Sequence, residues 1–308
     1  MTDQISELRR ACARVAQRAR SVRIERDAIA EYAAGLPLRT QSPPPNPEAH
    51  LLSGTAEERA AFWLTLDAIN FGSGWFPELR KRDGRSGYFT IAMGVRERFS
   101  TQGAWSAHEL TQLTSAEIAT SLRQSPGHEL MSLFAGSLRD LGCHVAAEHG
   151  GRFASVLHAG AGSAPALAQV LGGWACFADT STYDRFAVPF LKRAQIATAD
   201  LARAGVVDLP DLNRLTIFAD NLVPHVLRLD GVLRFDFELV GRIDAGELIE
   251  HGSPEEVEIR ACALHAAELI VAQRPGSCAA EVDSLLWHRG QQPRYKASPR
   301  HRSRCTAY

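Results

Sequence analysis

The sequence lacks the cysteine patterns that mark disulfide-bonded or metal-binding domains. Its cysteines are scattered without a CxxC pair, at Cys12, Cys143, Cys176, Cys262, Cys278 and Cys305. This spacing predicts reduced thiols and argues against a disulfide framework or a metal site. We therefore expect a cytoplasmic protein that uses no metal and no organic cofactor.

Long apolar runs and signal-peptide features are also missing from the 308 residues. No stretch is long enough to span a bilayer, and the N-terminus has no hydrophobic signal region. The net charge is -1, so no global field draws the chain to nucleic acid or to a membrane. We expect a monomer with a small-molecule substrate, no membrane contact and no stable nucleic-acid partner.

The charge is nevertheless uneven along the chain. Residues 1–26 are rich in arginine, and residues 289–304 carry several Lys and Arg but no acidic residue. A basic C-terminal tail of this kind is either solvated or available to bind phosphate. The sequence leaves both interpretations open.

Common enzyme motifs are absent as well: there is no GxGxxG, GxxxxGK[ST], HExxH or GxSxG. No repeat and no alternation of strands with helices is evident. Hydrophobic residues make up 45% of the chain, which is enough for a substantial core. The patterns predict a mainly α, single-domain helical globule with at most a small β-hairpin.

Local signals place the expected elements. A capping box at Thr55 and Glu58 predicts a helix start, as do Thr114 and Ser253. Two glycines among the aromatics of residues 71–77 predict a sharp turn or a close approach. We expect helices over residues 5–34 (one or two), 55–70, from Thr114 onward, 130–141, 163–171, from Pro189 onward, 209–217, 219–229, 236–242, 253–273 and 277–287. A turn and short strand are expected over residues 83–90, and a loop or hairpin over residues 175–188.

The prolines at positions 43, 44, 45 and 47 predict an extended linker. We therefore divide the chain into residues 1–47, an N-terminal helical segment with this linker, and residues 48–308, a catalytic domain. The two parts are expected to pack as one unit.

Two opposite charges stand in apolar surroundings, Lys192 and Asp220. Burying a charge without a partner costs several kcal/mol, so each needs an explanation. For Lys192 alone, the simpler interpretation is a surface lysine whose stem packs on apolar neighbours. Asp220 is either the N-cap of a helix over residues 221–229 or a site residue. These two roles are compatible, because a capped carboxylate is held ionised and oriented.

Phe177 and Asp179 lie in an irregular aromatic loop. An aromatic ring followed by a carboxylate can stack on a flat base and bind its N–H edge. The alternative is an ordinary loop with a core anchor. His50, Asp283 and His288, each taken alone, are more typical of structural or exposed positions.

The segment that starts at Ser253 holds a further group of polar residues. Glu256 and Arg260 form an i,i+4 pair, which is an ordinary helix-stabilising arrangement. Glu258, Cys262 and His265 share one face of the same helix. Three ligands from one helix with no outside partner are a weak signal, so we expect no metal there.

Several segments together resemble the queuosine salvage protein family. They are LDAINFGSGWFP, an FxD followed by VPFLKRAQI, LTIFADNLVPHVL, GSPEEVEIRACALHAAELI, DSLLW and PRHRSRCTAY, and they cover His50 to Tyr308. The resemblance implies a mainly helical fold similar to that of DNA glycosylases. It also implies hydrolysis of the N-glycosidic bond of queuosine 5'-monophosphate, or of queuosine, to release queuine for salvage into tRNA modification.

The resemblance also implies roles for particular residues. Asp220 matches the acid of the family's F-A-D motif and Lys192 the lysine of K-R-A-Q, so these two are the expected catalytic residues. Phe177 and Asp179 match a base-contacting F-x-D. The residues expected to bind substrate are His50, Phe177, Asp179, Asp283 and His288.

The chain departs from the family's commoner pattern at two places. Asn221-Leu-Val-Pro stands where Y-R-V-P is usual, and His265 where a large aromatic is expected. A related 7-deazapurine nucleoside therefore remains open as the substrate. Two other classes also remain open, a DNA base-excision glycosylase and a non-enzymatic protein that binds a modified base.

Overall fold

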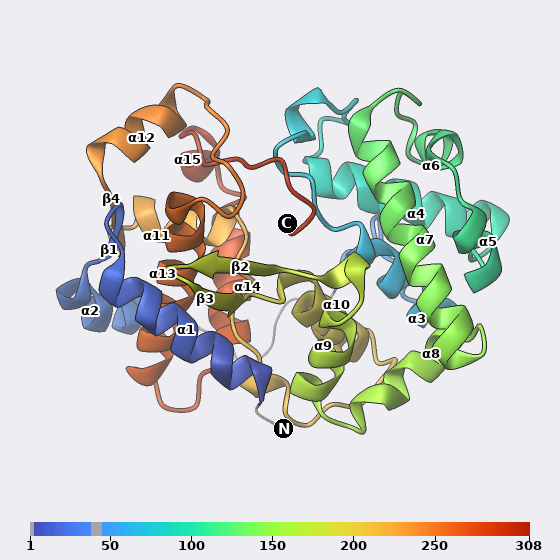
Figure 1. The fold of residues 1–308 in the computed structure, drawn as a ribbon, viewed down its shortest axis with the longest axis horizontal. Helices are drawn as coiled ribbons and strands as arrows, with labels where there is room; N and C mark the ends of the chain where they lie inside the picture. Colours follow the sequence, from blue (N-terminus) through green and yellow to red (C-terminus); the bar gives the residue numbers. More distant parts are fainter. Residues whose placement is uncertain (1–2, 38–44) are drawn as a thin grey trace. The chain divides into compact units, whose positions relative to one another are not determined.

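A computed structural model of the chain describes residues 3–37 and 45–308. The fold is mainly helical, as predicted, with fifteen α-helices and two small antiparallel strand pairs among these residues (Figure 1). One pair joins β1 to β4 and the other joins β2 to β3. The strands are β1 (Val22–Ile24), β2 (Thr180–Tyr183), β3 (Phe186–Pro189) and β4 (Leu233–Phe235).

The chain forms two compact units, each of which is assembled from separated segments. Of the described residues, the first unit contains 3–37, 179–192 and 211–305, and the second contains 45–178, 193–210 and 306–308. The described part of the N-terminal segment therefore belongs to the first unit. The division expected at residue 47 stays a prediction, and Pro43 and Pro44 lie outside the described residues.

The first unit is organised around α13 (Pro254–Ala272), which contacts α1, α2, α11 and α14. Most residues of α13 are buried on every side of the helix. α13 therefore lies inside the core, and its buried charged residues, Glu256, Glu258 and Arg260, need partners there. The other helices of this unit are α1 (Gln4–Arg18), α2 (Ile29–Gly35), α11 (Leu222–Leu229), α12 (Phe237–Asp244), α14 (Ala279–Arg289) and α15 (Pro293–Lys296).

The second unit is built on α7 (Glu129–His149), an amphipathic helix that contacts α3, α5, α6 and α8. Its apolar face, predicted over residues 130–141, packs inward. The segment of α10 after its first residue also belongs to this unit. The remaining helices are α3 (Ala56–Ala68), α4 (Gly87–Gln102), α5 (Ala107–Gln112), α6 (Ser115–Leu122), α8 (Phe153–Val156), α9 (Ala164–Gly172) and α10 (Lys192–Arg203).

The predicted helix starts and turns are confirmed where they depend on contacts between residues close together in the sequence. Thr55 Oγ1 accepts the N–H of Glu58 at 3.2 Å, while the Glu58 carboxylate accepts the N–H of Thr55 at 2.7 Å. Ser253 caps α13 by accepting the N–H of Glu256 at 3.3 Å. Gly72 has a φ of 104°, which favours glycine. The hairpin expected over residues 175–188 is β2 and β3.

The strand expected over residues 83–90 is wrong, because α4 begins at Gly87. Ser86 caps this helix by accepting the N–H of Phe89 at 3.4 Å. A Cβ at position 87 would collide with the ring of Phe76. The glycine therefore serves a close helix contact, and that contact overrides the β propensity of the residues after it.

Of two further expected helices, one begins later than predicted and the other is wrong. Pro189 ends β3 and does not open a helix, and α10 begins only at Lys192. Leu191 stands between them with a φ of 53°, a left-handed conformation that interrupts regular structure. Over residues 209–217 the structure has only a short 3₁₀ turn at Leu212–Arg214. Strand β1 was missed inside residues 5–34, because its partner β4 is far away in the sequence.

The basic tail is not a solvated segment. His301 and Ser303 are buried, and the N–H of Ile249 binds the carbonyl of Arg302 at 2.8 Å. The tail is therefore an integral part of the first unit as far as Cys305. Its arginines must be considered as parts of the folded protein.

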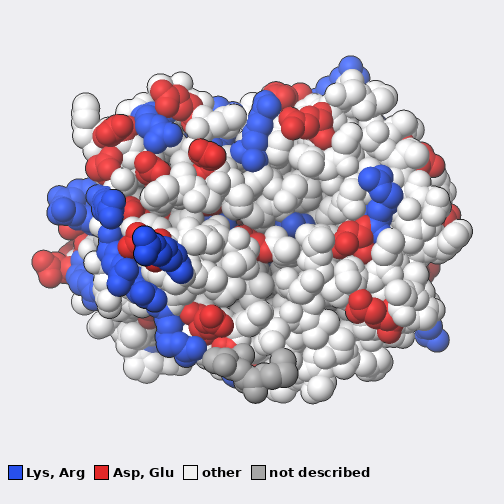
Figure 2. Space-filling model, viewed as in Figure 1, with Lys and Arg blue, Asp and Glu red and all other residues white. Residues whose placement is uncertain are grey.

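Arginine side chains gather over α1 and β1 (Figure 2). Part of this charge is already engaged, since Arg18 pairs with Asp184 at 3.3 Å and the Arg14 guanidinium lies 4.2 Å from the centre of the Phe186 ring. The exposed arginines of residues 1–26 that lie in or beside α1 and β1 are Arg10, Arg14, Arg18, Arg20 and Arg23.

None of the helices in the described part of the chain combines the length and hydropathy that a membrane crossing requires.

Candidate active site

Asp220 lies at the N-terminus of α11, where its carboxylate caps the helix. Oδ1 accepts the backbone N–H groups of Leu222, at 2.7 Å, and Val223, at 3.1 Å. These donors would otherwise have no partner within the helix. Oδ2 accepts no hydrogen bond from any described residue, and the side chain is partly exposed. The predicted capping role is confirmed, although the helix starts one residue later than expected.

The backbone before Asp220 is held by side chains from distant parts of the chain. Asp283 Oδ1 accepts the N–H of Phe218 at 2.8 Å. The carbonyl of Ala219 accepts a hydrogen bond from Arg260 Nε at 2.9 Å. Buried backbone groups outside helices and sheets need such partners. Asp283 thus supports the segment that carries Asp220, and its predicted contact with a base stays a prediction.

Lys192 is buried, with 4% of its surface exposed, so the interpretation as a surface lysine is wrong. It is the first residue of α10, and its backbone N–H binds Asp179 Oδ2 at 3.1 Å. The N–H of Leu191, the residue with a positive φ, binds the carbonyl of Asp179 at 3.2 Å. Asp179 therefore holds the backbone of two consecutive residues, Leu191 and Lys192, and so sets the position from which the Lys192 side chain extends.

Asp179 is in turn held by Arg260 in a buried, two-pronged ion pair. The guanidinium donates from Nη1 to Oδ1 at 3.0 Å and from Nη2 to Oδ2 at 2.6 Å. Both side chains are fully buried. Such forked pairs are among the strongest and most directional polar contacts in proteins. The carboxylate is thus engaged within the protein, and its predicted contact with a base stays a prediction.

Glu256 completes this charged group on the other side of Arg260, at 3.4 Å from Nη1. Burial alone would raise the pKa of Glu256, but Arg260 and the nearby His251 hold it at about 2. Glu256 is therefore ionised over the whole working pH range. The i,i+4 pair predicted with Arg260 is confirmed, but it lies in the core.

His50 lies in the second unit, buried between two aromatic residues. Its Nε2 is 2.9 Å from the hydroxyl of Tyr88, and its ring centre is 4.8 Å from that of Trp63. Burial lowers the pKa of His50 to about 4, so the ring is neutral at pH 7. Within residues 3–37 and 45–308, His50 Nδ1 and Trp63 Nε1 are buried without a hydrogen-bond partner. Polar atoms of this kind call for water or a ligand.

Phe177 is fully buried in the second unit. Its ring centre lies 6.3 Å from that of Trp174, and the Arg193 guanidinium is 6.0 Å away. Arg193 is itself bound to the carbonyls of Ala68, at 2.5 Å, and Cys176. In this conformation Phe177 acts as a core anchor, and stacking on a base, which would need an uncovered ring face, stays a prediction.

His288 is exposed on α14, where its Nδ1 lies 2.6 Å from the carbonyl of Ser284. Its ring contacts that of Trp287. The contacts found across the described residues do not join His288 to another predicted site residue. Its role in substrate binding stays a prediction that the geometry does not support.

Glu258 serves the fold of the first unit. Its Oε2 accepts the backbone N–H groups of Arg20, Ser21 and Val22, and its Oε1 accepts the Tyr183 hydroxyl at 2.7 Å. The carboxylate thus anchors the start of β1 to α13. Within the described ranges, no cluster of three or more His, Cys, Asp or Glu has the geometry to hold a metal ion.

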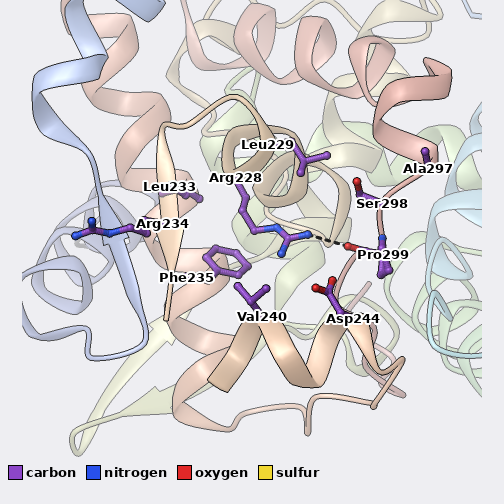
Figure 3. Close-up of a pocket in the computed structure, with 10 residues that line it drawn as sticks. All are labelled: Arg228, Leu229, Leu233, Arg234, Phe235, Val240, Asp244, Ala297, Ser298 and Pro299. Atoms are coloured by element: carbon purple, nitrogen blue, oxygen red, sulfur yellow. Dashed lines mark hydrogen bonds between the residues drawn. The ribbon is translucent and has the colours of Figure 1, made fainter. Parts of the chain in front are cut away.

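A surface pocket of about 600 Å³ lies elsewhere in the first unit (Figure 3). It is formed by α11, β4, α12 and residues 297–299, and Arg228 spans it to the carbonyl of Pro299 at 2.9 Å. None of the predicted site residues lines this pocket. We therefore do not assign the pocket to the candidate site.

Reasoning from sequence missed two site residues, Arg260 and Arg300. The signal for Arg260 was its position in the apolar stretch VEIRACAL, where a charged residue needs a buried partner. Arg300 belongs to the basic tail, whose charge pattern does not distinguish it from its neighbours. The sequence around Arg260 does not identify its partner, because Asp179 comes from another segment.

Three buried histidines make the protein sensitive to acid. Burial lowers the pKa of His50 and His225 to about 4 and that of His301 to about 3. As the pH falls below about 6.5, the unfolded chain binds protons before the folded one, so the free energy of unfolding must decrease. We expect a loss of several kcal/mol between about pH 7 and pH 4, since one pKa unit is worth about 1.4 kcal/mol. Urea unfolding at a series of pH values measures this loss of unfolding free energy.

Two histidine variants test whether the buried histidines cause this sensitivity to acid. His225→Gln keeps a donor for the carbonyl of Tyr295, which lies 2.8 Å from Nε2, and should weaken the acid dependence. His108→Gln, at an exposed position, should leave the dependence unchanged. An unfolding free energy that stays constant from neutral pH to pH 5 would contradict the prediction.

The fold and the site define a mainly helical protein with a capped, partly exposed carboxylate beside a buried ion pair. A family profile described as Queuosine salvage protein matches residues 50–308. A Sphaerobacter thermophilus protein named queuosine 5'-phosphate N-glycosylase/hydrolase is 36% identical, over 96% of this chain and 95% of the relative. Proteins with the same name from Nematostella vectensis and Mus musculus are 31% and 29% identical, over 68% and 56% of this chain and 64% and 56% of those relatives. The chain therefore belongs to the queuosine salvage protein family, which confirms the resemblance.

Proposed function

We propose that this protein hydrolyses the N-glycosidic bond of queuosine 5'-monophosphate, or of queuosine, and releases queuine for salvage into tRNA modification. The observation that carries the proposal is the Asp220 carboxylate, one oxygen of which is fixed by the α11 cap while the other is uncommitted. Membership of the queuosine salvage family and the names of the relatives support the substrate and the bond that is cleaved.

The chemistry needs a fixed negative charge. Cleavage of an N-glycosidic bond builds positive charge on the sugar and negative charge on the departing base. A preorganised carboxylate near C1' stabilises the sugar cation without having to reorient during the reaction. Asp220 either performs this stabilisation directly or activates the attacking water.

The leaving base poses a second requirement. A 7-deazaguanine has carbon in place of N7, so it cannot leave through protonation at that position. Hydrogen bonds to its other edges must stabilise the negative charge that develops. Carboxylates accept hydrogen bonds, so Asp179 and Asp283 remain candidates for orienting the base through its N–H groups, and Phe177 remains the candidate for stacking on it.

Lys192 has three candidate roles. It could pair with Asp220, contact the 5'-phosphate, or form a Schiff base with the sugar. Its buried position and its fixed backbone, held by Asp179, suit an oriented cation in each role. Trapping of a protein–sugar adduct with borohydride would support the third role.

The tail supplies a second cation for the phosphate, Arg300. Its side chain makes no hydrogen bond or ion pair with any residue in the described ranges. Burial lowers the pKa of Arg300, and the negative charge of Asp220 opposes this shift. The backbone carbonyl of the next residue, His301, accepts a hydrogen bond from Asn221 Nδ2 at 3.3 Å, which places the tail beside the α11 cap. A guanidinium is well suited to bind a phosphate with two hydrogen bonds.

Arg300→Gln should therefore raise the KM for queuosine 5'-monophosphate by about tenfold or more, the usual effect of losing a charged hydrogen bond. The KM for queuosine, which has no phosphate, should not change. Arg294→Gln, at an exposed position of the same tail, is the control and should alter neither value. Equal losses for both substrates would contradict the phosphate role.

One assay separates the proposed function from its rivals. The protein is incubated with queuosine 5'-monophosphate, queuosine and damaged duplex DNA, and free base is measured by mass spectrometry. We expect queuine from the nucleotide or nucleoside and no base from DNA. Base release from DNA with strongly salt-dependent binding would favour a DNA glycosylase, and tight queuine binding without release would favour a binding protein.

A further inference from the structure

The guanidinium of Arg260 binds both of the chain segments that carry the proposed catalytic residues. Nη1 and Nη2 bind both oxygens of Asp179, which accepts the backbone N–H of Lys192 at 3.1 Å. Nε binds the carbonyl of Ala219 at 2.9 Å, and Ala219 immediately precedes Asp220. One side chain thus connects the start of α10 to the start of α11.

The surroundings prevent this guanidinium from turning. The Phe190 ring covers one face, with its centre 3.9 Å from the guanidinium carbon. Glu256 lies 3.4 Å from Nη1, and Arg260 is fully buried on α13. A planar cation with donors on two edges can hold a carboxylate and a carbonyl at once, whereas a lysine ammonium is a point charge.

The two segments depend on these contacts, because regular structure does not support them. Leu191 has a φ of 53°, and residues 215–219 belong to no helix or strand in the described part of the chain. Their buried backbone groups are bound by the side chains of Asp179, Asp283 and Arg260. Loss of the Arg260 fork would therefore let both segments shift.

We propose that Arg260 is a positioning residue that holds Lys192 and Asp220 in their reactive arrangement. The inference rests on the proposed function, because it assumes that these two residues act in hydrolysis. Arg260 acts through Asp179 and the Ala219 carbonyl, without touching the substrate. Small displacements of reacting groups are costly, and about 1 Å is enough to lose about 10²-fold in rate.

Arg260→Lys tests the proposal, because it keeps the positive charge and removes the fork. We expect kcat for base release, corrected for the folded fraction, to fall about 10²-fold with KM nearly unchanged. The pH profile of kcat should shift as well, since the charged groups around Asp220 move. Folding is checked by circular dichroism and thermal unfolding.

The matched control is Arg289→Lys, which changes an arginine paired with a carboxylate, Asp230, at 2.7 Å in the same unit. A purely structural arginine should lose stability on this change while kcat per folded molecule stays normal. If Arg260→Lys behaves as Arg289→Lys does, the positioning role is overturned. If Arg260→Lys does not fold, Phe190→Leu decides, because it removes the covering ring and keeps every polar partner. We expect a smaller loss of kcat at unchanged KM, and a normal kcat would overturn the proposal.

The wild-type reaction distinguishes a failure of the proposed function from a failure of the positioning role of Arg260. Without base release by the wild type, the proposed function fails before any variant is compared. With normal release by the wild type and by both test variants, the proposed function stands and only the positioning role fails.

Discussion

Asp220→Asn should lose at least about 10²–10³-fold in the rate of base release while it folds normally, the usual effect of removing a preorganised charge. The amide keeps an oxygen that can accept the N–H groups of Leu222 and Val223, so the cap of α11 should survive. It cannot carry the negative charge that stabilises the sugar cation. Single-turnover release of queuine, with circular dichroism to verify folding, measures the effect.

A matched control exists in the same unit. Asp236 caps α12 by accepting the N–H of Leu239 at 2.7 Å, and it has no assigned role in the reaction. Asp236→Asn should therefore release queuine at the normal rate. If Asp220→Asn turned over as fast as this control, the assignment of Asp220 would have to be abandoned.

Glu258→Ala should reduce the free energy of unfolding by about 3–5 kcal/mol, the usual cost of breaking a buried charged network. Its carboxylate accepts three backbone N–H groups, from Arg20 at 3.0 Å, Ser21 at 2.8 Å and Val22 at 3.2 Å, and also the Tyr183 hydroxyl. Alanine would remove the acceptor of all three backbone N–H groups, of which the Val22 bond is fully buried, and the Tyr183 hydroxyl would keep only the carbonyl of Arg18, at 3.3 Å. Urea denaturation with a two-state fit gives the value.

Two further variants test whether the lost hydrogen bonds of the Glu258 carboxylate cause the decrease in stability. Glu238→Ala, at an exposed position on α12, should change stability by less than about 0.5 kcal/mol. Glu258→Gln retains one acceptor oxygen and should fall between the two. A loss below about 1 kcal/mol for Glu258→Ala would show that water or neighbouring groups replace the carboxylate.

Much of the helical architecture could be predicted, because helix starts depend on contacts within one turn. The capping boxes at Thr55 and Thr114 and the cap at Ser253 are local side-chain to backbone bonds, and the structure has all three. The cap by Asp220 is of the same kind, so its position followed from the sequence as well. Such signals need no knowledge of the rest of the fold.

The errors lie where a distant partner decides the local structure. The expected strand near residue 90 is instead the start of α4, where Gly87 packs against Phe76, a contact that no local pattern indicates. Residues 215–219 are extended and buried because Asp283 and Arg260 bind their backbone. Propensity over a short window cannot register such contacts.

The site was predictable to a similar extent. Asp220 and Lys192 were identified as charges in apolar surroundings, and the family resemblance supplied their roles. The burial of Lys192 and the importance of Arg260 depend on Asp179, which pairs with α13 across 81 positions of the sequence. A single sequence carries no direct sign of that pairing.

Hydrolysis of the N-glycosidic bond can be read from the products of the wild-type reaction. Queuosine 5'-monophosphate is incubated with the protein, and free queuine and ribose 5-phosphate are both quantified by mass spectrometry. We expect equal amounts of the two, with no accumulation of queuosine. An unchanged nucleotide, or queuosine formed by loss of phosphate alone, would contradict it.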